Sequence, residues 1–250
     1  MKALVTRPAE DAAPLARALA ERGIEAVLAP MLTIRPASDA ATRISDALIG
    51  AQAVLVTSAN GIRVFASASA RRELPVFAVG DASAAAARLA ECRSVTSAGG
   101  DVADLAALVA ARLSPQQGAL VHIAGSEVAG DLAGMLGKAG FAVRRVVVYE
   151  ARPAAALSPE AAAVIARGEP ALALFFSPRT AATFVRLAAA AGMGPSCRAL
   201  TALALSPAVA SALDALPWRH IAVARAPTQQ ALLEAIDRER GEHKRSMGAE

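Results

Sequence analysis

A chain of 250 residues, 55% hydrophobic and only 3% aromatic, has ample core material and suits one large domain or two small ones. It offers no secretion signal and no stretch of about 20 predominantly apolar residues, and two cysteines are too few for a disulfide framework or a zinc site. We therefore expect a cytoplasmic protein. Its net charge of +4, with arginine as the main basic residue, favours an anionic small molecule as the ligand. The sequence has no stripe of basic residues with interleaved aromatics, so we do not expect it to bind nucleic acid.

Short apolar runs alternate with amphipathic runs along the whole chain. The predicted strands are, in chain order, residues 3–6, 53–57, 76–79, 120–123, 143–149, 172–176, 199–205 and 220–223. The clearest helical patterns between them cover residues 15–22, 101–113, 179–191 and 228–239. Continuous apolar strands that alternate with helices are typical of α/β proteins whose parallel sheets are covered on both faces.

The chain also repeats itself at an offset of roughly half its length. The run VLVTSANGIRVFA from Val54 resembles ALFFSPRTAATFV from Ala173, and DVADLAALVAAR from Asp101 resembles PTQQALLEAIDR from Pro227. Repeated strand–helix units predict two similar lobes, each a parallel sheet flanked by helices. A cleft between such lobes, beyond the carboxyl ends of the strands, is a natural place for a ligand.

The predicted carboxyl ends of the strands carry small hydroxylated residues and arginines. They include Thr6-Arg7, Thr57-Ser58, Gly125-Ser126, Ser177-Pro178-Arg179 and Pro227-Thr228. Each hydroxyl could simply cap the helix that follows it, and each arginine could be a solvated loop charge. As a set, these residues and the helix N-termini predict a surface that binds anions.

The common cofactor and nucleophile motifs are missing from the sequence. It contains no G-x-x-x-x-G-K-[ST], no G-x-G-x-x-G and no G-x-S-x-G, and its three histidines lack metal-ligand spacing. His122 and His220 lie in strand patterns and are expected to be core residues. We therefore expect no cofactor and no metal, and a chemistry that relies on positioning and on one proton donor.

Several segments, in this order and spacing, resemble the uroporphyrinogen-III synthase family over residues 1–240. They are ALVTRP, VTSANGIRVF, FAVGDASA, VVVYEARP, FFSPRTAATF and APTQQALLEAI. The repeat alone suggests a boundary near Gln117, whereas the resemblance implies a discontinuous first lobe. Its implied organisation is lobe 1 from residues 1–34 and 153–240, lobe 2 from 36–149, strand-like linkers near 32–36 and 149–153, and a disordered tail at 241–250.

The resemblance implies a cyclising hydro-lyase of haem biosynthesis that needs no cofactor. Its substrate would be hydroxymethylbilane, a linear tetrapyrrole with two carboxylate arms on every pyrrole. The enzyme would close it to uroporphyrinogen III, with inversion of the last pyrrole ring and loss of water. We expect a monomer that binds neither nucleic acid nor a membrane, with hydroxymethylbilane synthase as a candidate transient partner.

The same resemblance implies roles for individual residues. Tyr149, the only tyrosine, would be the acid that assists departure of the substrate's hydroxyl; its alternative role is an aromatic that fills the hinge. The substrate-binding set would be Arg7, Thr57, Ser58, Ser83, Ser126, Ser177, Arg179 and Thr228, in which Ser126 rests on its position after a strand. Ala208 and Val209 stand where some relatives have a threonine pair, so backbone N–H groups or other side chains must make those contacts.

Two other functions are compatible with these features. One is a non-catalytic bilobed binding protein for a small anionic ligand, although its common periplasmic form carries a signal peptide. The other is a two-lobed sugar-nucleotide transferase, which is usually longer than this chain.

Overall fold

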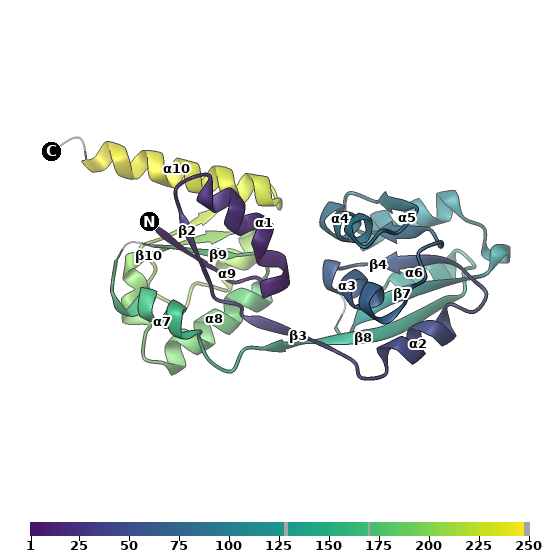
Figure 1. The fold of residues 1–250 in the computed structure, drawn as a ribbon. Coiled ribbons are helices and arrows are strands. Elements are labelled where there is room, and N and C mark those ends of the chain that lie inside the picture. Colours follow the sequence, from purple (N-terminus) through teal and green to yellow (C-terminus); the bar gives the residue numbers. More distant parts are fainter. Residues whose placement is uncertain (128–129, 170, 248–250) are drawn as a thin grey trace. The chain divides into compact units, whose positions relative to one another are not determined.

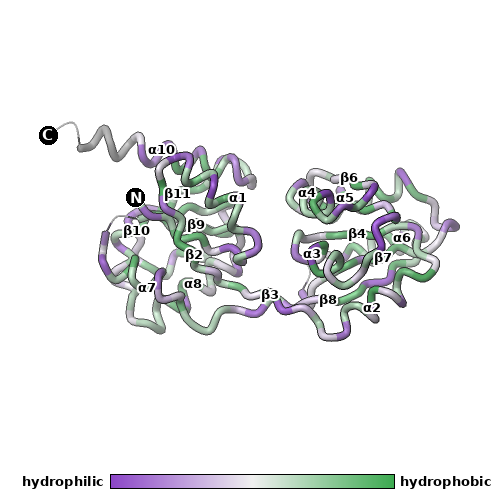
Figure 2. The backbone as a smooth tube through the Cα atoms, in the orientation of Figure 1, coloured by the Kyte–Doolittle hydropathy of each residue, from purple (hydrophilic) through white to green (hydrophobic). Residues whose placement is uncertain are grey.

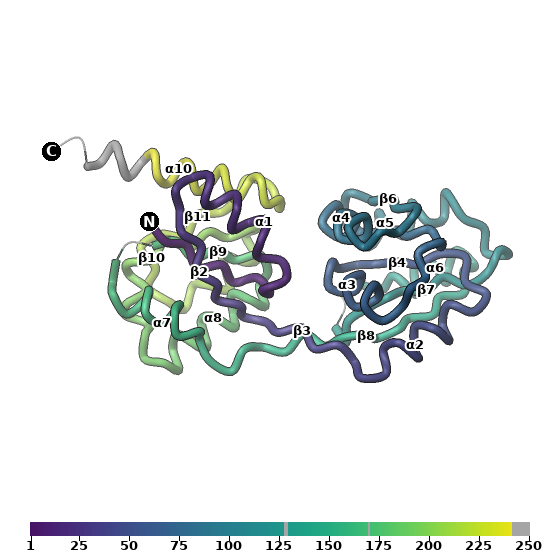
Figure 3. Tube along the Cα trace, viewed as in Figure 1, coloured from purple at the N-terminus to yellow at the C-terminus, as the bar shows by residue number. Residues whose placement is uncertain are grey.

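The computed structural model describes residues 1–127, 130–169 and 171–247, and the chain divides into two compact units. Unit 1 consists of Met1–Thr33 and Arg152–Glu250, and unit 2 of Ile34–Ala151. Figure 3 shows the two ends of the sequence, purple and yellow, in the same unit. The chain passes between the units within two strands that are neighbours in one sheet, so unit 1 is discontinuous in sequence.

Unit 1 contains a five-stranded parallel sheet in the order β11-β10-β9-β1-β2. Its strands are β1 (Lys2–Val5), β2 (Glu25–Leu28), β9 (Ala171–Phe175), β10 (Leu200–Ala204) and β11 (His220–Val223). Strand β1 lies between β9 and β2, so the first strand of the chain pairs with a strand from its last third (Figure 1).

Helices cover both faces of this sheet. They are α1 (Ala9–Ala20), α7 (Pro159–Ala166), α8 (Pro178–Ala190), α9 (Pro207–Ser211) and α10 (Gln229–Met247), with a short 3-10 turn at Pro195–Ala199. One core joins the sheet to α7, α8 and α9, and a second joins its other face to α1 and α10. Burial on both faces explains why the strands are apolar without alternation.

Unit 2 contains a six-stranded sheet in the order β3-β8-β7-β4-β5-β6. Its strands are β3 (Leu32–Pro36), β4 (Ala51–Val56), β5 (Val76–Ala78), β6 (Val95–Ser97), β7 (Ala119–Gly125) and β8 (Val143–Pro153). Strands β4 to β8 pair in parallel, which confirms the predicted α/β class with parallel sheets flanked by helices.

The helices of unit 2 again form two layers. They are α2 (Ala40–Ala47), α3 (Ala59–Ala68), α4 (Asp81–Leu89), α5 (Val102–Arg112) and α6 (Leu132–Lys138), with a 3-10 turn at Pro115–Gln117. One core joins the sheet to α2, α3 and α4, and the other joins it to α5 and α6. Figure 2 shows hydrophobic segments running through the sheet of each unit.

The last helix extends into the segment where the sequence predicts a tail. Helix α10 runs to Met247, and residues 248–250 lie outside the described residues. In the part of the chain that the structure describes, no helix is both long enough and apolar enough to cross a bilayer.

Candidate active site

A pocket of about 490 Å³ lies in unit 2, at the carboxyl ends of the parallel strands. Its lining is Thr57, Ser58, Val79, Asp101, Val102, Ala103, Gly125, Glu127, Gly130, Met135 and Tyr149. Thr57 and Ser58 follow β4 directly, Val79 follows β5, and Gly125 ends β7. This is where α/β sheets usually bind ligands. The pocket contains three of the predicted site residues.

Tyr149 is the aromatic residue of this pocket. It lies in β8, is 8% exposed, and its Oη is 2.8 Å from Ser58 Oγ. Gly125 is packed against its ring, since a Cβ there would lie 2.8 Å from Tyr149 Cζ. The backbone is also fixed at this point, because Ser126 N–H donates to Tyr149 O at 2.9 Å and Arg145 Nη2 donates to the Gly125 and Ser126 carbonyls at 2.9 Å. The phenol is therefore held in one place by β7, β8 and α3.

Ser58 has two functions in the structure. As the N-cap of α3, its Oγ accepts a hydrogen bond from Gly61 N–H at 3.0 Å, so the capping alternative applies. The same Oγ bonds Tyr149 Oη. Its hydroxyl thus connects the N-terminus of a helix to the phenol.

Thr57 contacts a histidine that the sequence did not single out for the site. His122 lies in β7, is 2% exposed, and its Nε2 is 3.1 Å from Thr57 Oγ1. Burial, and after it the nearby Arg145, lowers the pKa of His122 to about 4. The imidazole is therefore neutral near pH 7.

Two carboxylates also line the pocket, and neither was predicted from the sequence. Asp101 caps α5, accepting from Ala103 N–H at 2.7 Å and from Asp104 N–H at 3.2 Å. Glu127 follows β7 by two residues. The capping box in DVAD was the available signal for Asp101. Nothing in the sequence pattern marked Glu127.

Two further predicted residues of unit 2 are outside this lining. Ser83 is 5% exposed within α4, where it packs as a core residue of that helix. Ser126 lies immediately after β7, beside the lining residues Gly125 and Glu127, and contacts Tyr149 through its backbone.

The remaining predicted residues lie in unit 1, at the carboxyl ends of its strands. Arg7 follows β1; its guanidinium carbon is 3.7 Å from the centre of the Phe176 ring, and its Nη1 donates to Gln229 Oε1 at 2.7 Å. Burial lowers the pKa of Arg7, partly offset by Asp11. Arg7 is thus a half-buried cation, held by stacking and by a hydrogen bond.

The hydroxylated residues of unit 1 cap helices. Ser177 Oγ accepts from Thr180 N–H at 3.2 Å at the start of α8, and Thr228 Oγ1 accepts from Ala231 N–H at 3.2 Å at the start of α10. Arg179 lies in the first turn of α8. The capping alternative therefore applies to both hydroxyls, and it does not exclude ligand binding, because a capping oxygen still carries a proton.

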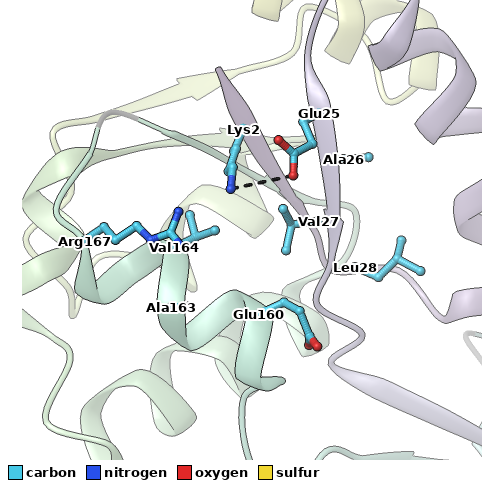
Figure 4. A pocket seen from close by; sticks show the side chains of 9 residues that line it. All are labelled: Lys2, Glu25, Ala26, Val27, Leu28, Glu160, Ala163, Val164 and Arg167. Atoms are coloured by element: carbon cyan, nitrogen blue, oxygen red, sulfur yellow. Dashed lines mark ion pairs between the residues drawn. The ribbon is translucent and has the colours of Figure 1, made fainter.

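A second hollow, of about 450 Å³, lies on the edge strand of unit 1. It is lined by Lys2, Glu25, Ala26, Val27, Leu28, Glu160, Ala163, Val164 and Arg167. Figure 4 shows Lys2 and Glu25 facing each other on β1 and β2, where their charged atoms are 3.7 Å apart. None of the predicted site residues lines this hollow, and its charges are mixed, so the pocket of unit 2 is the better candidate.

The residues that could bind a metal are dispersed. Within residues 1–127, 130–169 and 171–247, no group of three His, Cys, Asp or Glu side chains could hold an ion. Cys92 and Cys197 are buried and unbonded to each other, and burial raises the pKa of Cys197 to about 11.

Comparison with known proteins points to one family. The family described as "Uroporphyrinogen-III synthase HemD" matches residues 13–234. The fold is similar to uroporphyrinogen-III synthetase from Helicobacter pylori, with a TM-score of 0.61 and 14% identity over 93% of this chain and 96% of that one. It is also similar to a mutant uroporphyrinogen III synthase from Thermus thermophilus, with a TM-score of 0.54 and 15% identity over 100% of both chains. A search of curated proteins found no match. The family match covers most of the sequence, so this chain belongs to the uroporphyrinogen-III synthase family.

Proposed function

We propose that this chain closes hydroxymethylbilane to uroporphyrinogen III, with inversion of the last pyrrole ring and loss of water. Family membership makes it an enzyme of haem biosynthesis. The proposal also includes that the enzyme is a hydro-lyase, that it is cytoplasmic and monomeric, that it uses no cofactor, and that it makes a transient contact with hydroxymethylbilane synthase.

The observation that carries the proposal is the hydroxyl pair of Ser58 and Tyr149 in the pocket of unit 2. Loss of the substrate's hydroxyl needs a proton at its oxygen, and a tyrosine hydroxyl carries a proton that it can donate there. Ser58 Oγ accepts from Gly61 N–H, so its own proton can point to Tyr149 Oη. The phenol proton is then directed away from Ser58, toward a ligand. Hydrogen bonds aligned in this way strengthen one another, and the helix N-terminus stabilises the negative charge that develops on the phenol.

The reaction itself explains the acidic lining of the pocket. When the carbon–oxygen bond breaks, the oxygen leaves as water with the proton from Tyr149, and the pyrrole nitrogen's electron pair stabilises the cation that remains. Asp101 and Glu127 are unfavourable neighbours for a carboxylate arm but favourable ones for this positive charge. We therefore propose that the reacting pyrrole, rather than a carboxylate arm, occupies this pocket.

The carboxylate arms need cationic and hydroxyl partners, and unit 1 supplies candidates. Arg7 uses one of its five N–H donors on Gln229, and its ring contact with Phe176 fixes the plane of the guanidinium. A guanidinium whose plane is fixed in this way can bind a carboxylate through two parallel N–H···O hydrogen bonds. We include Ser177, Arg179 and Thr228 in this set because they lie at the starts of α8 and α10.

Product analysis tests the proposed function. Freshly made hydroxymethylbilane is incubated with the purified chain, and the oxidised products are separated by chromatography against a buffer control. We expect almost only the type III isomer, whereas buffer alone gives the isomer without inversion. A non-catalytic binding protein would leave the isomer ratio of the buffer control unchanged, and that result would refute the proposal.

A further inference from the structure

His122 contacts the pocket-lining residue Thr57 and lies on the sheet face that carries it. In the pairing of β4 with β7, Leu55 is opposite His122, and Thr57, two residues later, points to the same face. On the other side, Arg145 of β8 is opposite His122. The three polar side chains therefore lie on one face of the sheet, with His122 on the middle strand between Arg145 in β8 and Thr57 just after the end of β4.

This histidine is unusual for its surroundings. Its strand is buried at every position, and the core on this face is otherwise built from Leu, Val, Phe and Ala side chains. A buried imidazole is unfavourable in such a place unless it is hydrogen-bonded. The bond to Thr57, at 3.1 Å, satisfies this need and reaches across 65 positions of the sequence.

The contact constrains what Thr57 can offer to a ligand. A threonine hydroxyl has one proton to donate and lone pairs that accept, and either its oxygen or its methyl group can face a given direction. Bonding to His122 Nε2 selects one rotamer. Whichever ring nitrogen carries the proton, the imidazole takes one of the two roles of this hydroxyl and leaves the other for the pocket.

We propose that His122 is a positioning residue that presents the Thr57 hydroxyl to the substrate in a single orientation. This inference rests on the proposed function, because it assumes that the pocket of unit 2 binds the tetrapyrrole. It differs from the core role that the sequence indicates, since a core histidine would affect stability without affecting substrate binding.

Four variants test the proposal by steady-state kinetics: His122→Leu, His122→Gln, Thr57→Val and the double variant with His122→Leu and Thr57→Val. Leucine removes the hydrogen bond and keeps apolar volume, so KM should rise about three- to tenfold, the range of one neutral hydrogen bond, while kcat changes less than about twofold. Glutamine can place a polar atom near the position of Nε2, so the KM of His122→Gln should be close to that of the wild type. In the Thr57→Val background, His122→Leu should have no further effect.

The control is His220→Leu, because His220 is an exposed histidine of β11 in unit 1 and lies outside the pocket. It should leave KM unchanged. Unchanged KM in a folded His122→Leu protein, or independent effects of the two substitutions in the double variant, would overturn the proposal. Lack of any turnover by the wild type would instead refute the proposed function.

A measurement without substrate distinguishes failure of the His122 proposal from failure of the proposed function. Three-bond couplings to the Thr57 methyl group report its χ1 angle in solution. We expect one rotamer in the wild type and in His122→Gln, and an average over rotamers in His122→Leu. A single, unchanged rotamer in His122→Leu would show that the imidazole does not position Thr57.

Discussion

Thr57, Ser58 and Tyr149 each bring one hydroxyl to the pocket, and each hydroxyl already has a partner within the protein. Their positions at the carboxyl ends of predicted strands, together with the family resemblance, led to the prediction of all three as site residues from the sequence. Their partners could not be identified in this way. The Ser58–Tyr149 contact joins residues 91 positions apart, and such contacts depend on strand order and register, which the pattern of apolar residues does not specify.

The buried imidazole gives a pH prediction. His122 has a folded-state pKa of about 4, below the ordinary value of 6.5, so the unfolded chain binds its proton first as the pH falls. Stability should therefore decrease from pH 6.5 to pH 4, by at most about 3 kcal/mol from this group. Denaturant titrations of wild type and His122→Leu at pH 7 and pH 4 measure the difference. Equal losses of stability in the two proteins would contradict a neutral, buried His122.

Arg7 gives a second prediction at this scale. If its fork binds a carboxylate arm, Arg7→Ala should raise KM more than it lowers kcat, and the KM of the wild type should rise with salt because charge attraction is screened. Loss of the contact with Phe176 should also cost roughly 0.5–1 kcal/mol of stability. The matched control is Arg17→Ala, an exposed arginine in the last turn of α1. Equal KM values for the Arg7 and Arg17 variants would remove Arg7 from the site.

At the scale of elements, the apolar runs were a sufficient guide to the long buried strands, but they did not identify every short one. Strands β2 and β6 were missed: β2 has four residues and is exposed at both ends, and β6 has three half-buried residues. Helix α1 was predicted from residue 15 onward, which was wrong: it begins at Ala9 and continues through Pro14. Proline usually ends or kinks a helix, yet Pro14 lies inside α1.

The end of β7 gives a prediction about backbone packing. A Cβ at Gly125 would meet the ring of Tyr149 at 2.8 Å, so Gly125→Ala should displace the ring and lower kcat by about tenfold or more, within the range for loss of a positioned acid. Gly137→Ala is the control, since no atom outside the neighbouring residues and backbone of its own helix lies within 4 Å of a Cβ at that position. It should keep full activity and gain roughly 0.5–1 kcal/mol of stability. Full activity of Gly125→Ala would show that the ring position is not critical.

At the scale of the whole molecule, the two units differ in how their sheets are assembled. The family resemblance was needed to predict a discontinuous lobe, because the internal repeat alone indicated a cut near Gln117. Strand order explains why the repeat predicts the wrong boundary. Strand β1 lies between β2, which follows it in the sequence, and β9, which comes from the last third of the chain. The repeat records similar strand–helix units but not which of them pair.

This arrangement predicts different behaviour of the two halves as fragments. Residues 34–151 contain two complete cores of their own and should fold alone with cooperative unfolding. Residues 152–250 lack β1 and β2 and should not fold until residues 1–33 are supplied. Circular dichroism and thermal melts of the separate and mixed fragments measure this. Cooperative unfolding of 152–250 alone would contradict the central position of β1.

The central claim is that the hydroxyl pair of Ser58 and Tyr149 performs the chemistry, and Tyr149→Phe tests it most directly. The variant keeps the ring in its site beside Gly125 and removes only the oxygen bonded to Ser58, so KM and melting temperature should change little. We predict that kcat for uroporphyrinogen III falls by about tenfold or more, within the range for loss of a positioned acid, with partial activity because water can replace the phenol. A Phe variant with the kcat of the wild type would contradict the account, because Tyr149 would then only fill space.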